Sequence, residues 1–68
     1  MVNPLHIDEL KELNKLQNDG RGVSCVNSII YYLERQSYFD ALTVIDNEFD
    51  KLRNYPAIVQ WIKTNIPS

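Results

Sequence analysis

The chain of 68 residues is 44% hydrophobic and 24% charged, so it can form one domain at most, and its composition excludes a disordered protein. Its net charge of −2 argues against nucleic acid as a partner, because nucleic-acid affinity depends largely on Lys and Arg that neutralise phosphates. One cysteine and one histidine exclude an internal disulfide and a structural zinc site. We therefore expect residues 1–68 to form a single domain without a cofactor, which needs tight packing, self-association or a partner to be stable.

The first helix is predicted over residues 4–18. Asn3 and Pro4 have the character of an N-cap residue followed by proline at the first helical position. Apolar residues then recur at every third position, with charged residues between them: Ile7, Leu10, Leu13 and Leu16. The segment QNDGRG ends the helix, because Gly20 and Gly22 supply the positive φ that a tight turn requires.

A second helix is predicted over residues 24–36, with Ser24 as its N-cap. Its apolar stripe consists of Val26, Ile29, Ile30 and Leu33. The β-branched and aromatic residues between Val23 and Leu33 also fit a buried strand, which is the alternative. We favour the helix, because no second strand-like segment exists to pair with such a strand.

The third and longest helix is predicted over residues 38–53. Ser37 is followed three residues later by Asp40, in a pattern similar to a capping box. The helix keeps one apolar face, made of Tyr38, Ala41, Leu42, Ile45, Phe49 and Leu52. Pro56 ends it and starts a fourth helix, predicted over residues 56–65 and closed by Pro67.

These elements predict an all-α fold, a small four-helix mini-domain built from helical hairpins. The predicted core consists of Leu10, Leu13, Leu16, Val26, Ile29, Ile30, Leu33, Ala41, Leu42, Ile45, Phe49, Leu52, Ile58 and Ile62. The longest apolar run, Ile29–Leu33, spans five residues, whereas a membrane helix needs roughly 20. The N-terminus also lacks the basic start and apolar centre of a signal peptide. We expect no membrane association and a reduced, cytoplasmic setting.

The elbow between the second and third helices has three possible roles: a DNA-reading helix-turn-helix, a protein-binding hairpin or the middle of a bundle. A recognition helix normally presents Lys, Arg, Asn or Gln to DNA. The third helix instead carries four carboxylates, Asp40, Asp46, Glu48 and Asp50, so we expect no DNA binding through it. A nucleic-acid-associated regulatory factor is the alternative if folding clusters the basic residues Lys11, Lys15, Arg21, Arg35, Arg53 and Lys63.

The sequence contains no convincing catalytic constellation. The segment DGRGVSC has the glycines of a phosphate-binding loop but lacks the Lys-Ser or Lys-Thr ending of a P-loop. Cys25 stands near a predicted helix start, and His6 is the one histidine that could act as its base. A small buried thiol is the simpler interpretation. We therefore predict that the protein is not an enzyme.

The aromatic residues outnumber what one apolar stripe per helix can bury. We expect a protein interface that draws on Tyr31, Phe39, Tyr55 and Trp61, because exposed Tyr and Trp are common anchors at interfaces. Asp46 and Asp50 would add an acidic part to this surface. For Trp61, a place in the core is the alternative.

Residues 25–53 resemble a single tetratricopeptide-type helical hairpin. Tyr32, Ala41 and Ile45 have the spacing of the aromatic, small and large apolar residues that interlock the two helices in that family, and QSYFDAL is similar to its inter-helix turn. Two features depart from the family pattern: Glu48 replaces a second small residue, and the closing proline, Pro56, comes late. The resemblance implies a protein-binding hairpin without naming a partner.

Taken with the charge and the lack of catalytic motifs, this resemblance predicts a small non-catalytic interaction or regulatory module. Such a module would be an adaptor or modulator of a larger protein, or it would self-associate, for example as a homodimer.

Overall fold

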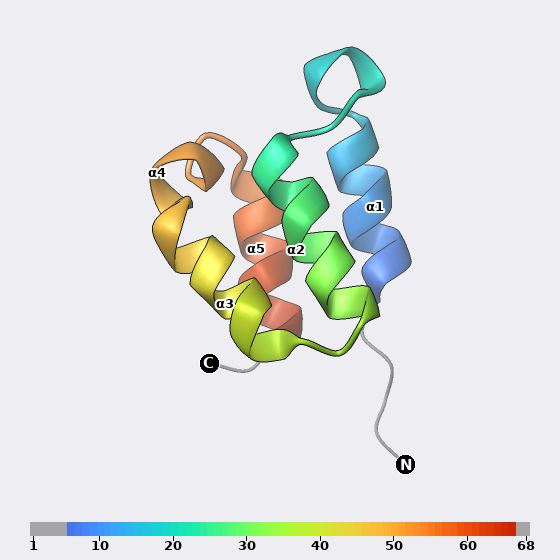
Figure 1. Cartoon of the computed structure of the whole chain (residues 1–68). Coiled ribbons are helices and arrows are strands. Elements are labelled where there is room, and N and C mark those ends of the chain that lie inside the picture. The colour runs from blue at the N-terminus through green and yellow to red at the C-terminus, as the bar shows by residue number, and fades with distance from the viewer. Residues whose placement is uncertain (1–5, 67–68) are drawn as a thin grey trace.

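The computed structural model describes residues 6–66 and confirms the all-α prediction (Figure 1). In chain order the elements are α1 (Ile7–Lys15), the short 3-10 helix η1 (Asn18–Gly20), α2 (Ser24–Glu34), α3 (Tyr38–Asn47), α4 (Phe49–Leu52) and α5 (Pro56–Asn65). The described residues contain no strand, so the helical interpretation of Val23–Leu33 is confirmed. Among these residues, no helix has both the length and the apolar character needed to cross a bilayer.

Helix α1 is shorter than predicted. It begins at Ile7 and ends at Lys15, and the predicted start at Asn3 and Pro4 lies outside the described residues. Leu16 was predicted to be buried, but this is wrong because its side chain is 77% exposed. Successive helical residues turn by about 100°, so a three-residue spacing drifts by about 60° at each step and carries Leu16 away from the face of Leu10.

A buried asparagine holds the loop between α1 and α2. The side-chain oxygen of Asn14 accepts a hydrogen bond from the backbone N–H of Val23 at 2.6 Å, and its Nδ2 donates to Oδ1 of Asn27 at 2.7 Å. The loop itself uses left-handed backbone at four positions, Asn18, Asp19, Gly20 and Gly22, all residue types that tolerate positive φ. Val23, rather than the predicted Ser24, is the N-cap of α2.

The elbow between α2 and α3 is a Schellman-type helix end. Gln36 adopts a left-handed φ of 62°, its N–H donates to the carbonyl of Leu33 at 3.0 Å, and the N–H of Ser37 donates to the carbonyl of Tyr32 at 2.8 Å. Ser37 is the N-cap of α3, as predicted, but its side chain makes no capping hydrogen bond. The backbone of the elbow, and not the expected capping box, therefore sets the angle between the two helices.

The predicted helix over residues 38–53 is broken at Glu48. This residue has φ −107° and ψ 15°, outside helical geometry, so α4 starts in a new direction (Figure 1). The bend brings α4 against α5. It also leaves Phe49 45% exposed, so its assignment to the core is wrong.

The core draws residues from all five α-helices. It contains Leu10, Val23, Cys25, Val26, Ile29, Ile30, Leu33, Ala41, Leu52, Ile58, Trp61 and Ile66, while the predicted core residues Leu13, Leu42, Ile45 and Ile62 are partly buried around it. Helix α5 begins at Pro56 and ends at Asn65, as predicted; Pro67 lies outside the described residues. The indole N–H of Trp61 donates to the carbonyl of His6 at 3.2 Å. This hydrogen bond joins α5 to the residue that precedes α1.

Candidate protein-interaction surface

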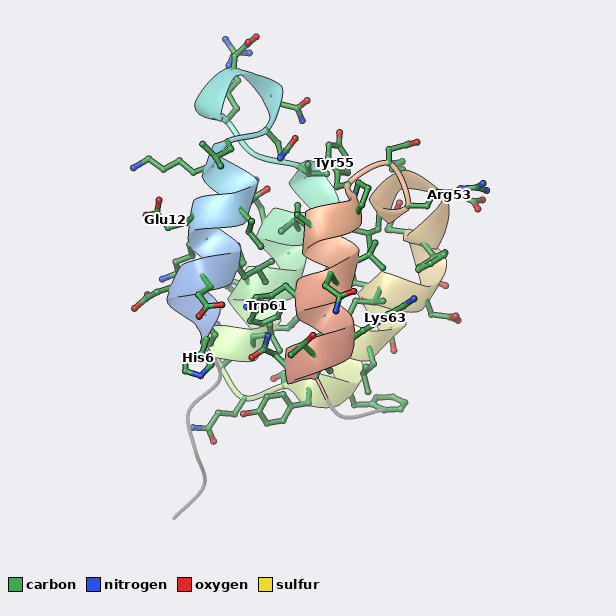
Figure 2. The ribbon with its side chains drawn as sticks, turned by 180° about the vertical axis from the view of Figure 1, so that it is seen from behind. His6, Glu12, Arg53, Tyr55, Trp61 and Lys63 are labelled. Atoms are coloured by element: carbon green, nitrogen blue, oxygen red, sulfur yellow. The ribbon has the colours of Figure 1, made fainter. Side chains whose placement is uncertain are left out.

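Four aromatic residues were predicted to contribute to an interface, and the structure separates them. Phe39 is 81% exposed and Tyr31 is 52% exposed, whereas Tyr55 is partly buried. Trp61 is only 4% exposed and packs in the core beside α1, which its hydrogen bond to His6 fixes (Figure 2). The prediction of Trp61 as an interface residue is therefore wrong, and its alternative place in the core is confirmed.

Tyr31 is held in position on the outer side of α2. The guanidinium carbon of Arg35, one turn later, lies 4.5 Å from the centre of its ring, a cation–π distance. The neighbouring Tyr32 ring forms a T-shaped pair with it, with the ring centres 5.5 Å apart and the ring planes at 76°. Because both neighbours restrict the ring, Tyr31 loses little rotational freedom when a partner contacts it.

Phe39 begins a stripe of exposed residues along the solvent side of α3. Phe39, Thr43 and Asp46 follow one another at helical spacing on α3, Asp50 follows in α4 beyond the break at Glu48, and all four are exposed. We call these residues the acidic face. Among the described residues, Asp46 and Asp50 form no ion pair. The face thus combines one large apolar anchor with two uncompensated negative charges.

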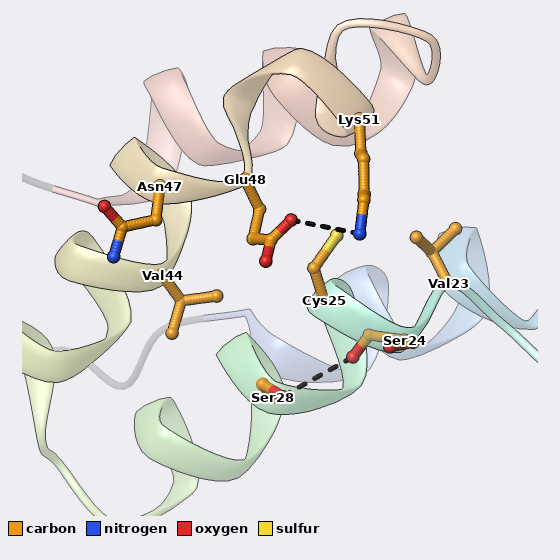
Figure 3. Close-up of a pocket in the computed structure, with 8 residues that line it drawn as sticks. All are labelled: Val23, Ser24, Cys25, Ser28, Val44, Asn47, Glu48 and Lys51. Carbon is orange, nitrogen blue, oxygen red and sulfur yellow. Dashed lines mark hydrogen bonds and ion pairs between the residues drawn. The ribbon is translucent and has the colours of Figure 1, made fainter.

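A small cleft of about 240 Å³ opens between the start of α2 and the α3–α4 junction (Figure 3). Cys25 lies at its base, and Glu48 and Lys51 form an ion pair of 3.3 Å above it. Burial, and to a lesser degree the negative charge of Glu48, raises the pKa of the Cys25 thiol. The thiol is therefore held in its neutral, weakly nucleophilic form, and the interpretation of Cys25 as a small buried thiol is confirmed.

Histidine and cysteine do not come together in this cleft. His6 is not among the lining residues and lies before α1, where its backbone carbonyl contacts Trp61. Within residues 6–66 no group of three His, Cys, Asp or Glu side chains is placed to hold a metal ion. What the cleft offers chemically is a polar rim over a protonated sulfur.

The basic residues are spread over several elements. Lys11 on α1 forms an ion pair with Glu34 on α2 at 2.8 Å, and Lys51 is paired with Glu48. Figure 2 shows Arg53 and Lys63 reaching outward from different helical segments on the side opposite Glu12. Two of the seven basic residues are thus already neutralised by neighbouring carboxylates.

A second exposed feature was missed because its members had been assigned to the core face of the third helix. Tyr38, Leu42 and Ile45 lie on one flank of α3, Phe49 follows in α4 beyond the break at Glu48, and we call these four residues the apolar stripe. Tyr38 is 40% exposed and Phe49 45% exposed, while the two aliphatic residues between them are only partly covered. The regular spacing of four, three and four residues was the available signal for such a stripe.

Comparison of the chain with protein-family models, with curated proteins and with solved structures finds no match in any of the three. The surfaces described above are therefore what bears on function.

Proposed function

We propose that this protein is a small, non-catalytic, cytoplasmic interaction module, an adaptor or modulator that binds another protein through the outer sides of α2 and α3. The observation that carries the proposal is Phe39, whose ring is 81% exposed at the start of the acidic face. Burying such a side chain against a partner contributes about 1.5–3 kcal/mol, which makes it a suitable anchor. Tyr31, ordered by Arg35, supplies a second aromatic contact on the neighbouring helix.

In the proposed module, α2 and α3 form a closely packed helical hairpin. Ala41 is fully buried, and a side chain of this size lets two helices approach closely. Tyr32 of α2 and Ile45 of α3 are partly buried against the core. In this proposal the hairpin is a rigid support, and the residues that it turns outward, Tyr31 and Phe39, make the contact with the partner.

The charge of the acidic face favours a protein surface over nucleic acid. Asp46 and Asp50 are exposed and unpaired within the described chain, so they would repel phosphate groups that approach α3. The same carboxylates attract Lys and Arg of a partner and would increase the rate of association.

Site-specific photo-crosslinking in the host cell tests the proposal. A photoreactive residue at position 39 is compared with one at Gln60, which is exposed on α5. We expect discrete protein adducts from position 39 that excess unlabelled protein suppresses and that an excess of the Phe39→Ser variant does not. Adducts that are identical from both positions, or that the variant suppresses equally well, would contradict the proposal.

A titration with random-sequence DNA tests the alternative of a nucleic-acid-associated factor. Electrostatic binding to DNA is strongest at low salt. We expect no association there, and binding that weakens steeply as salt increases would favour the alternative.

A further inference from the structure

The break between α3 and α4 lies in a segment whose local sequence favours one continuous helix. We infer that Glu48 is a hinge: when residues 38–53 straighten into a single helix, two copies of this chain exchange α4 and α5 and form a domain-swapped dimer. The inference goes beyond the proposed function, because neither the hinge nor the exchanged helices contain Tyr31 or Phe39.

The sequence around the break contains no signal for a bend. Sharp bends in helices normally occur at proline or glycine, and residues 38–53 contain neither. Apolar residues also keep helical intervals of three, four and three across the break, at Leu42, Ile45, Phe49 and Leu52. Local preference therefore does not specify the bend.

The backbone hydrogen bonds show what the bend gives up. The helical pattern holds on either side of it, since the N–H of Glu48 donates to the carbonyl of Val44 at 2.9 Å and that of Leu52 to the carbonyl of Glu48 at 3.0 Å. Between them, the N–H groups of Phe49 and Asp50 donate to no backbone carbonyl of the described residues. In a continuous helix both would have an acceptor four residues earlier, so straightening gains these helical hydrogen bonds.

Tertiary packing is what keeps the segment bent. Helix α4 packs against α5, and Leu52 of α4 is fully buried. From α5, Ile58 and Trp61 enter the core, and the indole of Trp61 is bonded to the carbonyl of His6. Residues 38–53 therefore have two arrangements, bent while α5 is docked in its own bundle and straight once α5 has left it. An element of this kind is bistable and can act as a hinge.

A second copy of the chain is the partner that fits the vacated core. In the straight form α4 continues the axis of α3, so α5 is carried away from its own α1. A second straight copy has the same vacancy, which the departing helices fill with Leu52, Ile58, Trp61 and Ile66. Reciprocal exchange then restores the packing of α5 on α1, while both hinges keep the added hydrogen bonds.

Two substitutions at the hinge test its part in the exchange. Glu48→Ala and Glu48→Gly remove the same ion pair with Lys51, but glycine opposes the straight helix more strongly than alanine does. The unmodified protein and both variants are unfolded in urea, refolded over a concentration series and analysed by sedimentation equilibrium. We expect dimers at high concentration, with a dissociation constant at least about tenfold lower for Glu48→Ala than for Glu48→Gly, since each dimer contains two hinges. An unmodified protein that stays monomeric throughout the series, or equal dissociation constants for the two variants, would overturn the inference.

A mixture of two core variants tests the exchange itself. Leu10→Asp in α1 and Ile58→Asp in α5 each place a carboxylate at a fully buried position, so neither chain should fold alone. In an exchanged pair, α1–α3 of the Ile58→Asp chain and α4–α5 of the Leu10→Asp chain form one bundle without either substitution. We therefore expect the two chains, refolded together, to recover helical circular dichroism that neither gives alone.

Leu52→Asp mixed with Ile58→Asp is the matched control. Both substitutions lie in the exchanged helices, so every bundle contains one of them and the mixture should stay unfolded. If the mixture of Leu10→Asp and Ile58→Asp is as unfolded as its components, or if the control recovers equally, the exchange is contradicted. None of these variants changes Tyr31 or Phe39, so the crosslinking result expected at position 39 can fail or stand separately.

Discussion

The side-chain oxygen of Asn14 in α1 lies 2.6 Å from the backbone nitrogen of Val23, the residue that caps α2. One buried amide thereby connects two helices and the loop between them. Its Nδ2 is also used, as a donor to Asn27, so both ends of the amide have partners.

We predict that Asn14→Ala lowers the free energy of unfolding by about 2 kcal/mol. The substitution leaves the buried N–H of Val23 without an acceptor, and an unsatisfied buried polar group costs about 1–3 kcal/mol. Urea titration followed by circular dichroism measures the effect. Asn47→Ala, at an exposed position, is the control and should change stability by no more than about 0.5 kcal/mol. Equal effects of the two substitutions would contradict this role of Asn14.

The two glycines of the α1–α2 loop form a matched pair. Both have positive φ, 82° at Gly22 and 87° at Gly20, so alanine is strained at either position by about 1–2 kcal/mol. A Cβ on Gly22 would lie 2.6 Å from Nδ2 of Asn14, whereas a Cβ on Gly20 meets its nearest atom at 3.8 Å. We expect Gly22→Ala to be more destabilising than Gly20→Ala by a further 1–3 kcal/mol, roughly the cost of overpacking. Thermal unfolding of the two variants side by side measures the difference, and equal losses would mean that Asn14 yields without cost.

Trp61 is the one tryptophan of the chain, so its fluorescence reports the packing of α5 on α1. Since it is 4% exposed, we expect blue-shifted emission and weak quenching by acrylamide in the folded protein, both reversed by urea. Trp61→Phe removes the donor to the carbonyl of His6 and part of the buried ring. This variant should lose about 1–3 kcal/mol of stability. Strong acrylamide quenching of the folded protein would place the indole at the surface, against the structure.

Cys25 should make stability depend on alkaline pH. Its pKa is raised in the folded protein, chiefly by burial, so the folded thiol keeps its proton to higher pH than the unfolded one. The resulting contribution is fully present below the ordinary thiol range, roughly pH 8.5, and is lost as the pH rises through that range toward the raised folded value. Cys25→Ala has no such titration, so its unfolding free energy should fall less than that of the unmodified protein on going from neutral to alkaline pH. Parallel curves for the two proteins would argue against a raised pKa.

The same residue can be tested by its reactivity. A disulfide reagent should modify Cys25 in the folded protein at least about tenfold more slowly than in urea, because the thiol is buried and neutral. Equal rates in the two conditions would show that the cleft leaves the sulfur accessible.

Local patterns predicted most of the helices, because their ends depend on nearby residues. Pro56 starts α5 where the sequence indicates, and the glycine-containing segment after α1 forms the expected turn. The break at Glu48 was missed, since the chain has neither glycine nor proline there. That bend accompanies the packing of α4 on the following helix α5, a tertiary contact that periodicity does not contain.

Local patterns likewise predicted only part of the candidate surface, because they contain no information on contacts between helices. Phe39 and Tyr31 lie away from the apolar positions of their own helices, and the structure leaves both exposed. Trp61 depends on α1, far away in the sequence, so its own helix could not decide between core and surface. The apolar stripe looks from the sequence like any core-facing row, and only the tertiary packing determines how much of it is left uncovered.

The hydrogen bond from Trp61 to His6 joins residues that are 55 positions apart in the chain. Until α5 has packed, the core positions filled by Ile58, Trp61 and Ile66 are empty, and the apolar side of α1 lacks part of its native cover. Closing the core therefore requires contact between the two ends of the described chain, which is costly in loop-closure entropy and slows folding.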